Sequence, residues 1–173
     1  MQVVADTSAL VSLGAVADHE WNPLDYLLDQ HTVLVPKLVV DELTETATYD
    51  DTSGQGALRV LDRQQALDVR DITLDESFPL DDGENAAVTL ANDCGAAQLL
   101  CDEFNQLALV HASLVDTRLV TTPTLLLALT RNDAVTPKTA RSLLALMREA
   151  RSWTNNRYVE RAEIVLTDAN ESS

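Results

Sequence analysis

The chain has 173 residues, of which 46% are hydrophobic, and a formal net charge of −16 from 28 acidic and 12 basic side chains. This length and apolar fraction fit one globular domain with a sizeable core, and no apolar run approaches the roughly 18–20 residues of a membrane span. The start of the chain lacks the basic flank and long apolar stretch of a signal peptide, so we expect a cytoplasmic protein.

Short apolar runs alternate along the chain with segments of helical periodicity. The runs that we expect to be strands are residues 2–6, 32–35, 67–72, 98–102 and 118–120. The segments that we expect to be helices are residues 8–14, 21–30, 37–48, 57–65, 82–92, 103–112, 123–131, 137–151 and 155–163. The polar, glycine-containing segment 49–56 is expected to be a loop.

Strands separated by helices are typical of a parallel sheet with helices on both faces. We therefore predict an α/β protein with a single domain over residues 1–166, followed by a polar, frayed tail at 167–173. In parallel sheets of this kind the functional site forms outside the carboxyl ends of the strands. Acidic residues at the carboxyl ends of the expected strands are therefore the first candidates for functional residues.

Two aspartates directly follow apolar runs. Asp6 ends the first expected strand and Asp102 ends the fourth. A carboxylate at the end of an apolar strand needs a hydrogen-bonding partner or a cation. Asp6 is also suited to cap the following helix, but Thr7 and Ser8 are better placed to do so, and a functional role is favoured for both aspartates.

Two glutamates lie on expected helices. Glu42 follows Pro36 on the helix after the second strand, where a single glutamate is usually solvated. Glu84 lies three residues after Asp81, which is the spacing of a helix capping box. Read alone, Glu84 is as well explained by capping as by function, so the two glutamates depend on their context.

The charge of the chain is unevenly distributed. Seven of the twelve basic residues lie between positions 131 and 161, where they form either a phosphate-binding face or an ordinary solvated helix face. Elsewhere the acidity would oppose binding of nucleic acid, but in multimolar salt the Debye length is about 3 Å or less and the repulsion is screened. We therefore interpret the acidity as an adaptation to a salt-rich cytoplasm, as in a halophile.

Four acidic motifs follow one another in a recognisable order along the chain. They are residues 6–8, 39–43, 80–87 and 99–103. This ordered set resembles the PIN-domain nuclease family over residues 3–129, with an extension through 153–160. The Gly83-Glu84 pair and the segment 121–126 resemble a PIN subgroup of prokaryotes, VapC-like proteins among them.

The resemblance implies a three-layer α/β/α fold with a central parallel sheet. It implies that Asp6, Glu42, Glu84 and Asp102 are catalytic and hold one or two Mg²⁺ or Mn²⁺ ions for hydrolysis of RNA. Carboxylate oxygens are the ligands that such hard cations prefer. The resemblance also implies a role as the toxin of a toxin–antitoxin pair, with a small antitoxin-like protein as partner. The residues that it places near the substrate are Thr7, Ser8, Thr121 and Thr122.

The chain departs from this pattern after Asp102. The subgroup often has an arginine there, whereas here Glu103 follows and no basic residue occurs until Arg118. Glu103 is then a candidate fifth carboxylate for the metal. The absent arginine leaves open a second interpretation, a catalytically idle PIN fold that serves as a protein-interaction module.

The early helices raise the question of self-association. Their apolar residues either form a homodimer surface or pack in the core; these residues are Leu24, Tyr26, Leu27 and Leu28.

Overall fold

A computed structural model describes all residues from Met1 to Ser173. Its centre is a five-stranded sheet in the order β3-β2-β1-β4-β5, in which every neighbouring pair is parallel. The strands are β1 (Gln2–Ala5), β2 (Thr32–Pro36), β3 (Asp68–Arg70), β4 (Gln98–Leu100) and β5 (Arg118–Val120). All five expected strands are present, although the first, third and fourth are shorter than expected.

Side chains of the central strand alternate between two cores. Val3 and Ala5 belong to the larger core, whereas Val4 belongs to the smaller core on the other face. A strand buried on both faces has no polar face, which explains the continuous apolar runs in the sequence.

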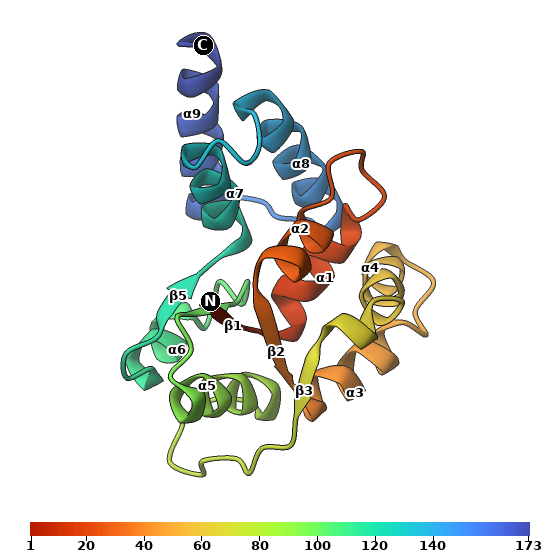
Figure 1. Cartoon of the computed structure of the whole chain (residues 1–173), viewed down its shortest axis with the longest axis vertical. Helices are drawn as coiled ribbons and strands as arrows, with labels where there is room; N and C mark the ends of the chain where they lie inside the picture. Colours follow the sequence, from red (N-terminus) through yellow and green to blue (C-terminus); the bar gives the residue numbers. More distant parts are fainter.

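Nine helices surround the sheet. They are α1 (Thr7–Ala15), α2 (Pro23–Gln30), α3 (Lys37–Thr46), α4 (Thr52–Leu61), α5 (Asp82–Cys94), α6 (Leu107–Ser113), α7 (Thr122–Arg131), α8 (Pro137–Ala150) and α9 (Arg157–Glu171). Figure 1 shows α5 and α6 on one side of the strands and α1, α2 and α7–α9 on the opposite side. The predicted three-layer α/β/α fold is thereby confirmed. None of the helices is long and apolar enough to cross a membrane.

Helix α4 begins inside the segment that was expected to be a loop. The two glycines that favoured a loop are instead contact points: a Cβ on Gly54 would lie 1.9 Å from the Tyr49 carbonyl oxygen, and one on Gly56 would lie 2.7 Å from the Val11 carbonyl oxygen. Gly56 therefore lets α4 pack backbone-to-backbone against α1. The loop prediction was wrong for residues 52–56 because these glycines serve close packing rather than a turn.

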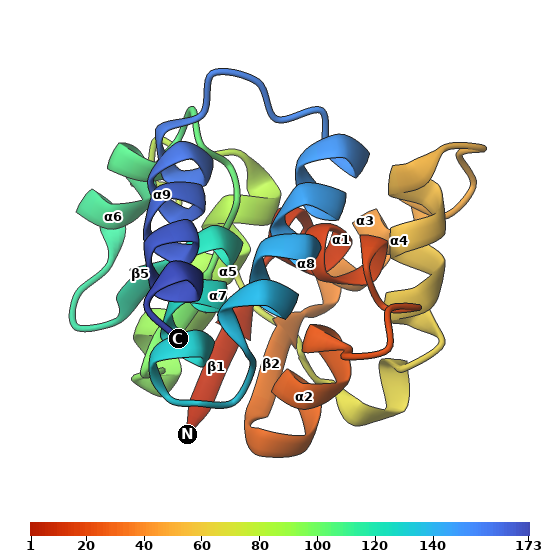
Figure 2. The ribbon, with the colours of Figure 1, turned by 90° about the horizontal axis from the view of Figure 1, so that it is seen from above.

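Helix α9 is longer than expected. It continues to Glu171 instead of ending near residue 163, and so includes most of the segment expected to be a frayed tail. Val159, Ala162 and Leu166 are buried along one face, against α7 and α8 (Figure 2). This apolar face extends the helix into the polar end of the chain. Helix α6 differs in the opposite sense, beginning at Leu107 rather than 103, after a turn.

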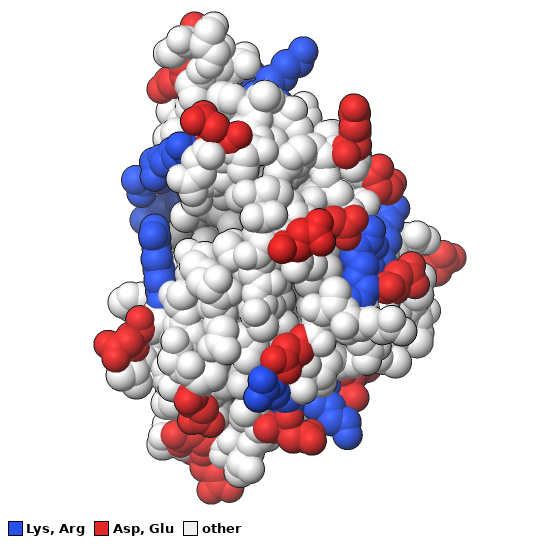
Figure 3. All heavy atoms as spheres, viewed as in Figure 1, with Lys and Arg blue, Asp and Glu red and all other residues white.

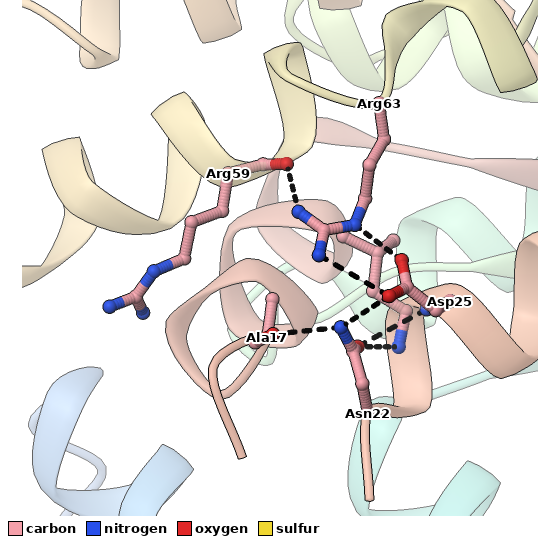
Figure 4. Close-up of polar contacts among 6 residues, drawn as sticks. Ala17, Asn22, Asp25, Arg59 and Arg63 are labelled. Carbon is pink, nitrogen blue, oxygen red and sulfur yellow. Dashed lines mark hydrogen bonds and ion pairs between the residues drawn. The ribbon is translucent and has the colours of Figure 1, made fainter. Parts of the chain in front are cut away.

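A polar network fixes α2 between the end of α1 and α4. Asn22 caps α2 and donates to the Ala17 carbonyl at 2.7 Å and to Asp25 at 2.8 Å. The Arg63 guanidinium, from the turn that follows α4, also donates to Asp25 (Figure 4). With α2 held in this way, Leu24 and Leu27 are buried.

The apolar residues of α2, for which a homodimer surface was one of two alternatives, pack within the chain itself. Leu24 and Leu27 lie in the larger core, and Tyr26 and Leu28 pack against it. Of the two alternatives for these residues, the structure supports packing in the core.

The basic residues of the segment 131–161 do not form one continuous face. Arg148 pairs with Glu163 at 2.8 Å, and Arg141 lines a groove between α8 and α9 together with Glu160 and Glu163. In the view of Figure 3, basic side chains form separate groups, and acidic side chains occur in several places around them. This dispersed arrangement favours an ordinary solvated helix face over a phosphate-binding face. Arg151 is the exception, because it lines the cleft described below.

Candidate active site

The site forms where the carboxyl ends of β1 and β4 meet. These strands are neighbours, with Ala5 in register with Leu100, and the Asp6 amide donates to the Leu100 carbonyl at 3.0 Å. The carboxylates that follow the two strands, Asp6 and Asp102, are therefore brought to the same edge of the sheet, as the sequence predicts. Both are buried.

Asp6 has two roles in the structure. It is the N-cap of α1, where its carboxylate accepts from the Ala9 amide at 2.9 Å. The expectation that Thr7 or Ser8 would cap this helix was wrong. The Ser8 hydroxyl instead lies 2.8 Å from both Asp6 carboxylate oxygens and accepts from the Asp102 amide at 2.8 Å, so it links the two aspartates. Burial raises the Asp6 pKa from 3.8 to about 7, opposed by these hydrogen bonds.

Asp102 is held by the start of α7. Its two carboxylate oxygens accept from the Thr122 amide at 2.7 Å and the Thr122 hydroxyl at 2.6 Å. Burial raises its pKa, and these hydrogen bonds oppose the rise. Thr122 is fully buried, and Thr121 caps α7 and is 4% exposed. The expected substrate contact of Thr121 and Thr122 is therefore not what the structure supports, because Thr122 positions Asp102 and Thr121 positions the helix.

Glu42 approaches the site from α3. The Thr7 hydroxyl donates to its carboxylate, which lies against the first turn of α5. A Cβ on Gly83 would be 2.3 Å from the nearer Glu42 oxygen, so this approach requires a glycine. Burial raises the pKa of Glu42, and the Asp81 charge raises it further. Gly83 was noted in the sequence as part of a motif, but its contact with Glu42 depends on the fold.

Glu84 lies in the first turn of α5. Asp81 caps this helix and accepts from the Glu84 amide at 2.9 Å. The reciprocal half of the capping box is absent: no protein group donates to the Glu84 carboxylate, although the residue is only 7% exposed. Burial, followed by the charges of Asp81 and Glu103, raises its pKa to about 7. The capping explanation for this carboxylate is therefore insufficient.

An open cleft of about 500 Å³ lies beside these carboxylates. The expected site residues Thr7, Ser8, Glu42 and Glu103 line it. The other lining residues are Val11, Glu45, Thr46, Tyr49, Asp51, Ser53 and Arg151. Asp6, Glu84 and Asp102 are not part of the cleft wall, although Ser8 of the wall hydrogen-bonds to both Asp6 and Asp102.

Arg151 lines the cleft, although the sequence pattern did not predict it as a site residue. It follows α8 directly and is the only basic residue among those that line the cleft. Its charge lowers the pKa values of Asp102 and Glu103, opposing the effect of burial. The sequence contained only an indirect signal, the cluster of basic residues between 131 and 161.

The residues fit a hard divalent cation in donor chemistry. Five carboxylates with raised pKa values surround one corner of the sheet; they are Asp6, Glu42, Glu84, Asp102 and Glu103. No three of the acidic, histidine or cysteine side chains are close enough together to enclose one ion. Mg²⁺ retains several waters and uses few direct carboxylates, so this spacing is compatible with an ion held partly through water.

Comparison with known proteins identifies the family. The family DUF3368, described as a PIN domain, matches residues 2–168. The chain therefore belongs to the PIN-domain family.

Among solved structures, the chain is similar to one chain of the crystal structure of VapBC2 from Rickettsia felis bound to a DNA fragment from their promoter. The identity is 13%, the TM-score is 0.47, and the alignment covers 70% of this chain and 98% of the other. No curated protein matches the sequence.

Proposed function

We propose that the chain is a metal-dependent endoribonuclease that hydrolyses RNA phosphodiesters. The observation that carries this proposal is the group of five carboxylates, because burial and mutual repulsion oppose their ionisation and a bound cation would favour it. Membership of the PIN-domain family supports the reaction class.

The protein residues have distinct roles in this proposal. Asp6 and Asp102 would hold a Mg²⁺ or Mn²⁺ ion at the sheet edge, and Glu42, Glu84 and Glu103 would contribute through its bound waters. The bound ion would supply an activated water for in-line attack and stabilise negative charge on the phosphate. Ser8 and Thr122 fix the orientation of Asp6 and Asp102, and Thr7 fixes that of Glu42.

The open cleft supports an extended substrate. Thr7 lines it beside Glu42, where a backbone phosphate would lie close to the ion. We expect the Thr7 hydroxyl to contact RNA there. Ser8 is only 5% exposed and its hydroxyl is already bonded to Asp6 and Asp102, so its role is to position these carboxylates.

The test is cleavage of an RNA pool in Mn²⁺ at high KCl. Asp6→Asn keeps the side-chain size and the capping ability of this position but removes the charge, and we expect it to lower cleavage at least about 100-fold. Exposed Gln55→Ala is the matched control. Equal cleavage by the parent and Asp6→Asn would refute the assignment.

We further propose that the chain is the toxin of a toxin–antitoxin pair. Family membership supports this role, and a small antitoxin-like protein would be the partner. Expression of the chain alone should slow growth of its host, and Asp6→Asn should not. Growth inhibition that persists in Asp6→Asn would refute a toxicity caused by RNA cleavage.

A further inference from the structure

We propose that Arg151 and Tyr49 form the substrate-binding pair of the cleft: Arg151 binds a backbone phosphate of the RNA, and Tyr49 stacks on an adjacent unpaired base. This proposal rests on the proposed nuclease function and assigns residues to its substrate.

The first argument is the free hydrogen-bonding capacity of Arg151. Acidic residues Glu42, Glu45, Asp51 and Glu103 line the same cleft, yet the four salt bridges of the protein all involve other residues. The only hydrogen bond that the Arg151 guanidinium donates goes to the Ser53 hydroxyl at 3.1 Å. Its Nε is buried and has no partner. An arginine with most of its planar donors unused is suited to a phosphate group.

The second argument is the position of Arg151. Its backbone is fixed at the junction of two helices, because the Thr52 hydroxyl of α4 donates to the Ala150 carbonyl at the end of α8 at 2.8 Å. The side chain lines the cleft together with Glu103, the residue after Asp102. A phosphate held there would lie beside the carboxylates. Arg151 thus supplies, from the far end of the chain, the positive charge that is absent after Asp102.

The third argument concerns the aromatic ring at the cleft. Tyr49 is 53% exposed and lines the cleft. Its backbone is held by two contacts: its amide donates to the Thr46 carbonyl at 3.0 Å, and its carbonyl lies against Gly54. An exposed ring on a fixed backbone is suited to stacking on an unpaired base, whereas the bases of a duplex are hidden from it.

The first experiment measures steady-state cleavage of a single-stranded RNA in Mn²⁺ at high KCl. For Arg151→Gln we expect KM to rise about 10- to 100-fold, as for loss of a charge-assisted hydrogen bond, with little change in kcat. Arg151→Lys should restore part of the loss. Arg131→Gln removes an exposed charge at the far end of α7 and should leave KM unchanged. The rise in melting temperature on adding Mn²⁺ should be the same in Arg151→Gln as in the parent, which excludes a merely structural effect.

The second experiment measures binding of a labelled single-stranded RNA, and of its duplex, to the Asp6→Asn variant in Mn²⁺. Adding Tyr49→Ala should weaken single-strand binding roughly 10-fold, the size expected for one lost stacking contact, and Tyr49→Phe should not. The duplex should bind more weakly than the single strand.

The outcomes separate this proposal from the nuclease function. If the parent cleaves RNA and Arg151→Gln leaves KM unchanged, the substrate-binding pair is refuted and the nuclease stands. If the parent cleaves no RNA but binding still depends on Arg151 and Tyr49, the nuclease is refuted and the binding site stands. Equal binding of duplex and single strand refutes the preference for unpaired bases.

Discussion

At the scale of single residues, Thr122 determines where the Asp102 carboxylate points. Its backbone amide and its hydroxyl both donate to this carboxylate, one to each oxygen. Residues that orient a metal ligand typically contribute about 10- to 100-fold to metal affinity or activity. Thr122 therefore belongs to the site although it does not reach the cleft.

We predict that Thr122→Val, which removes the hydroxyl and preserves the shape, lowers RNA cleavage about 10- to 100-fold. The amide of residue 122 would still donate to Asp102, so the loss should be smaller than for Asp102→Asn. Steady-state cleavage assays of the parent, Thr122→Val and Asp102→Asn measure these relative losses of activity. Thr139→Val, at a half-buried position of α8 outside the cleft, serves as control, and full activity of Thr122→Val would contradict the assigned role.

The raised pKa values of Asp6 and Glu84 predict how stability depends on pH without metal. Both groups have folded-state pKa values of about 7, above their ordinary values of 3.8 and 4.5. The folded protein therefore retains protons that the unfolded chain releases, and the free energy of unfolding falls as the pH rises through this window. The contribution becomes flat only about one pH unit above these pKa values, where both groups are ionised in the folded and the unfolded state.

Melting temperatures measured in EDTA across this pH window test the prediction. The decline should be smaller in the double variant Asp6→Asn, Glu84→Gln, since neither amide titrates. Mn²⁺ binds the ionised carboxylates, so it should raise the melting temperature of the parent more at the alkaline end than at the acidic end. An identical pH profile for parent and double variant would show that these two groups do not cause the decline.

At the scale of elements, the contact between α1 and α4 shapes one wall of the cleft. A Cβ on Gly56 would meet the Val11 carbonyl oxygen at 2.7 Å and the Ala15 amide nitrogen at 3.1 Å. Neither backbone atom can move without displacing α1. The position of Ser53 and hence of Arg151 depends on this packing, because Ser53 lies in the first turn of α4.

We predict that Gly56→Ala lowers the free energy of unfolding by about 1–3 kcal/mol, the usual cost of overpacking a tight interface. Gln55→Ala, the adjacent exposed position of the same helix, should be neutral or slightly stabilising because alanine favours helix. Denaturant unfolding of both variants gives the comparison. A Gly56→Ala variant as stable as the parent would show that α1 and α4 can separate without cost.

The sequence predicted elements well where a local pattern determined them. The buried strands were recognisable because a strand covered on both faces is apolar throughout. Helix α4 was misread because Gly54 and Gly56 look the same in a turn and in a tight helix contact. Arg151 was not identified because its place in the cleft depends on a contact between α4 and α8, with Ser53 and Arg151 separated by 98 positions in the chain.

In the candidate site, too, residues set by a local pattern could be predicted, and residues set by contacts distant in the sequence could not. Asp6 and Asp102 could be predicted because each follows a strand whose end lies at the functional edge of a parallel sheet. Glu42 could not be placed from the residues alone, since its approach depends on Gly83 of another helix. The burial of Thr122 was equally invisible in the sequence, because nothing local distinguishes a positioning threonine from one that contacts substrate.

At the scale of the whole molecule, the dominant feature is the net charge of −16. Only four salt bridges compensate it, and acidic side chains are spread over the visible surface (Figure 3). Mutual repulsion among such charges destabilises the compact state and repels RNA at low ionic strength. Salt at molar concentration screens both effects.

We therefore predict that the melting temperature rises steadily from low to multimolar KCl. The measurement is thermal unfolding at constant pH in EDTA, so that divalent ions do not contribute. Unchanged stability over this range would contradict the interpretation of the acidic surface as an adaptation to salt.

The central claim is that the carboxylates at the ends of β1 and β4 form a metal site that cleaves RNA. The most direct test compares the parent with Asp6→Asn and Asp102→Asn in cleavage of an RNA pool with Mn²⁺ at high KCl, each variant being confirmed as folded. We predict cleavage by the parent that EDTA abolishes and that both substitutions reduce at least about 100-fold. Equal cleavage by the parent and the two variants, or no cleavage by a folded parent, would contradict the claim.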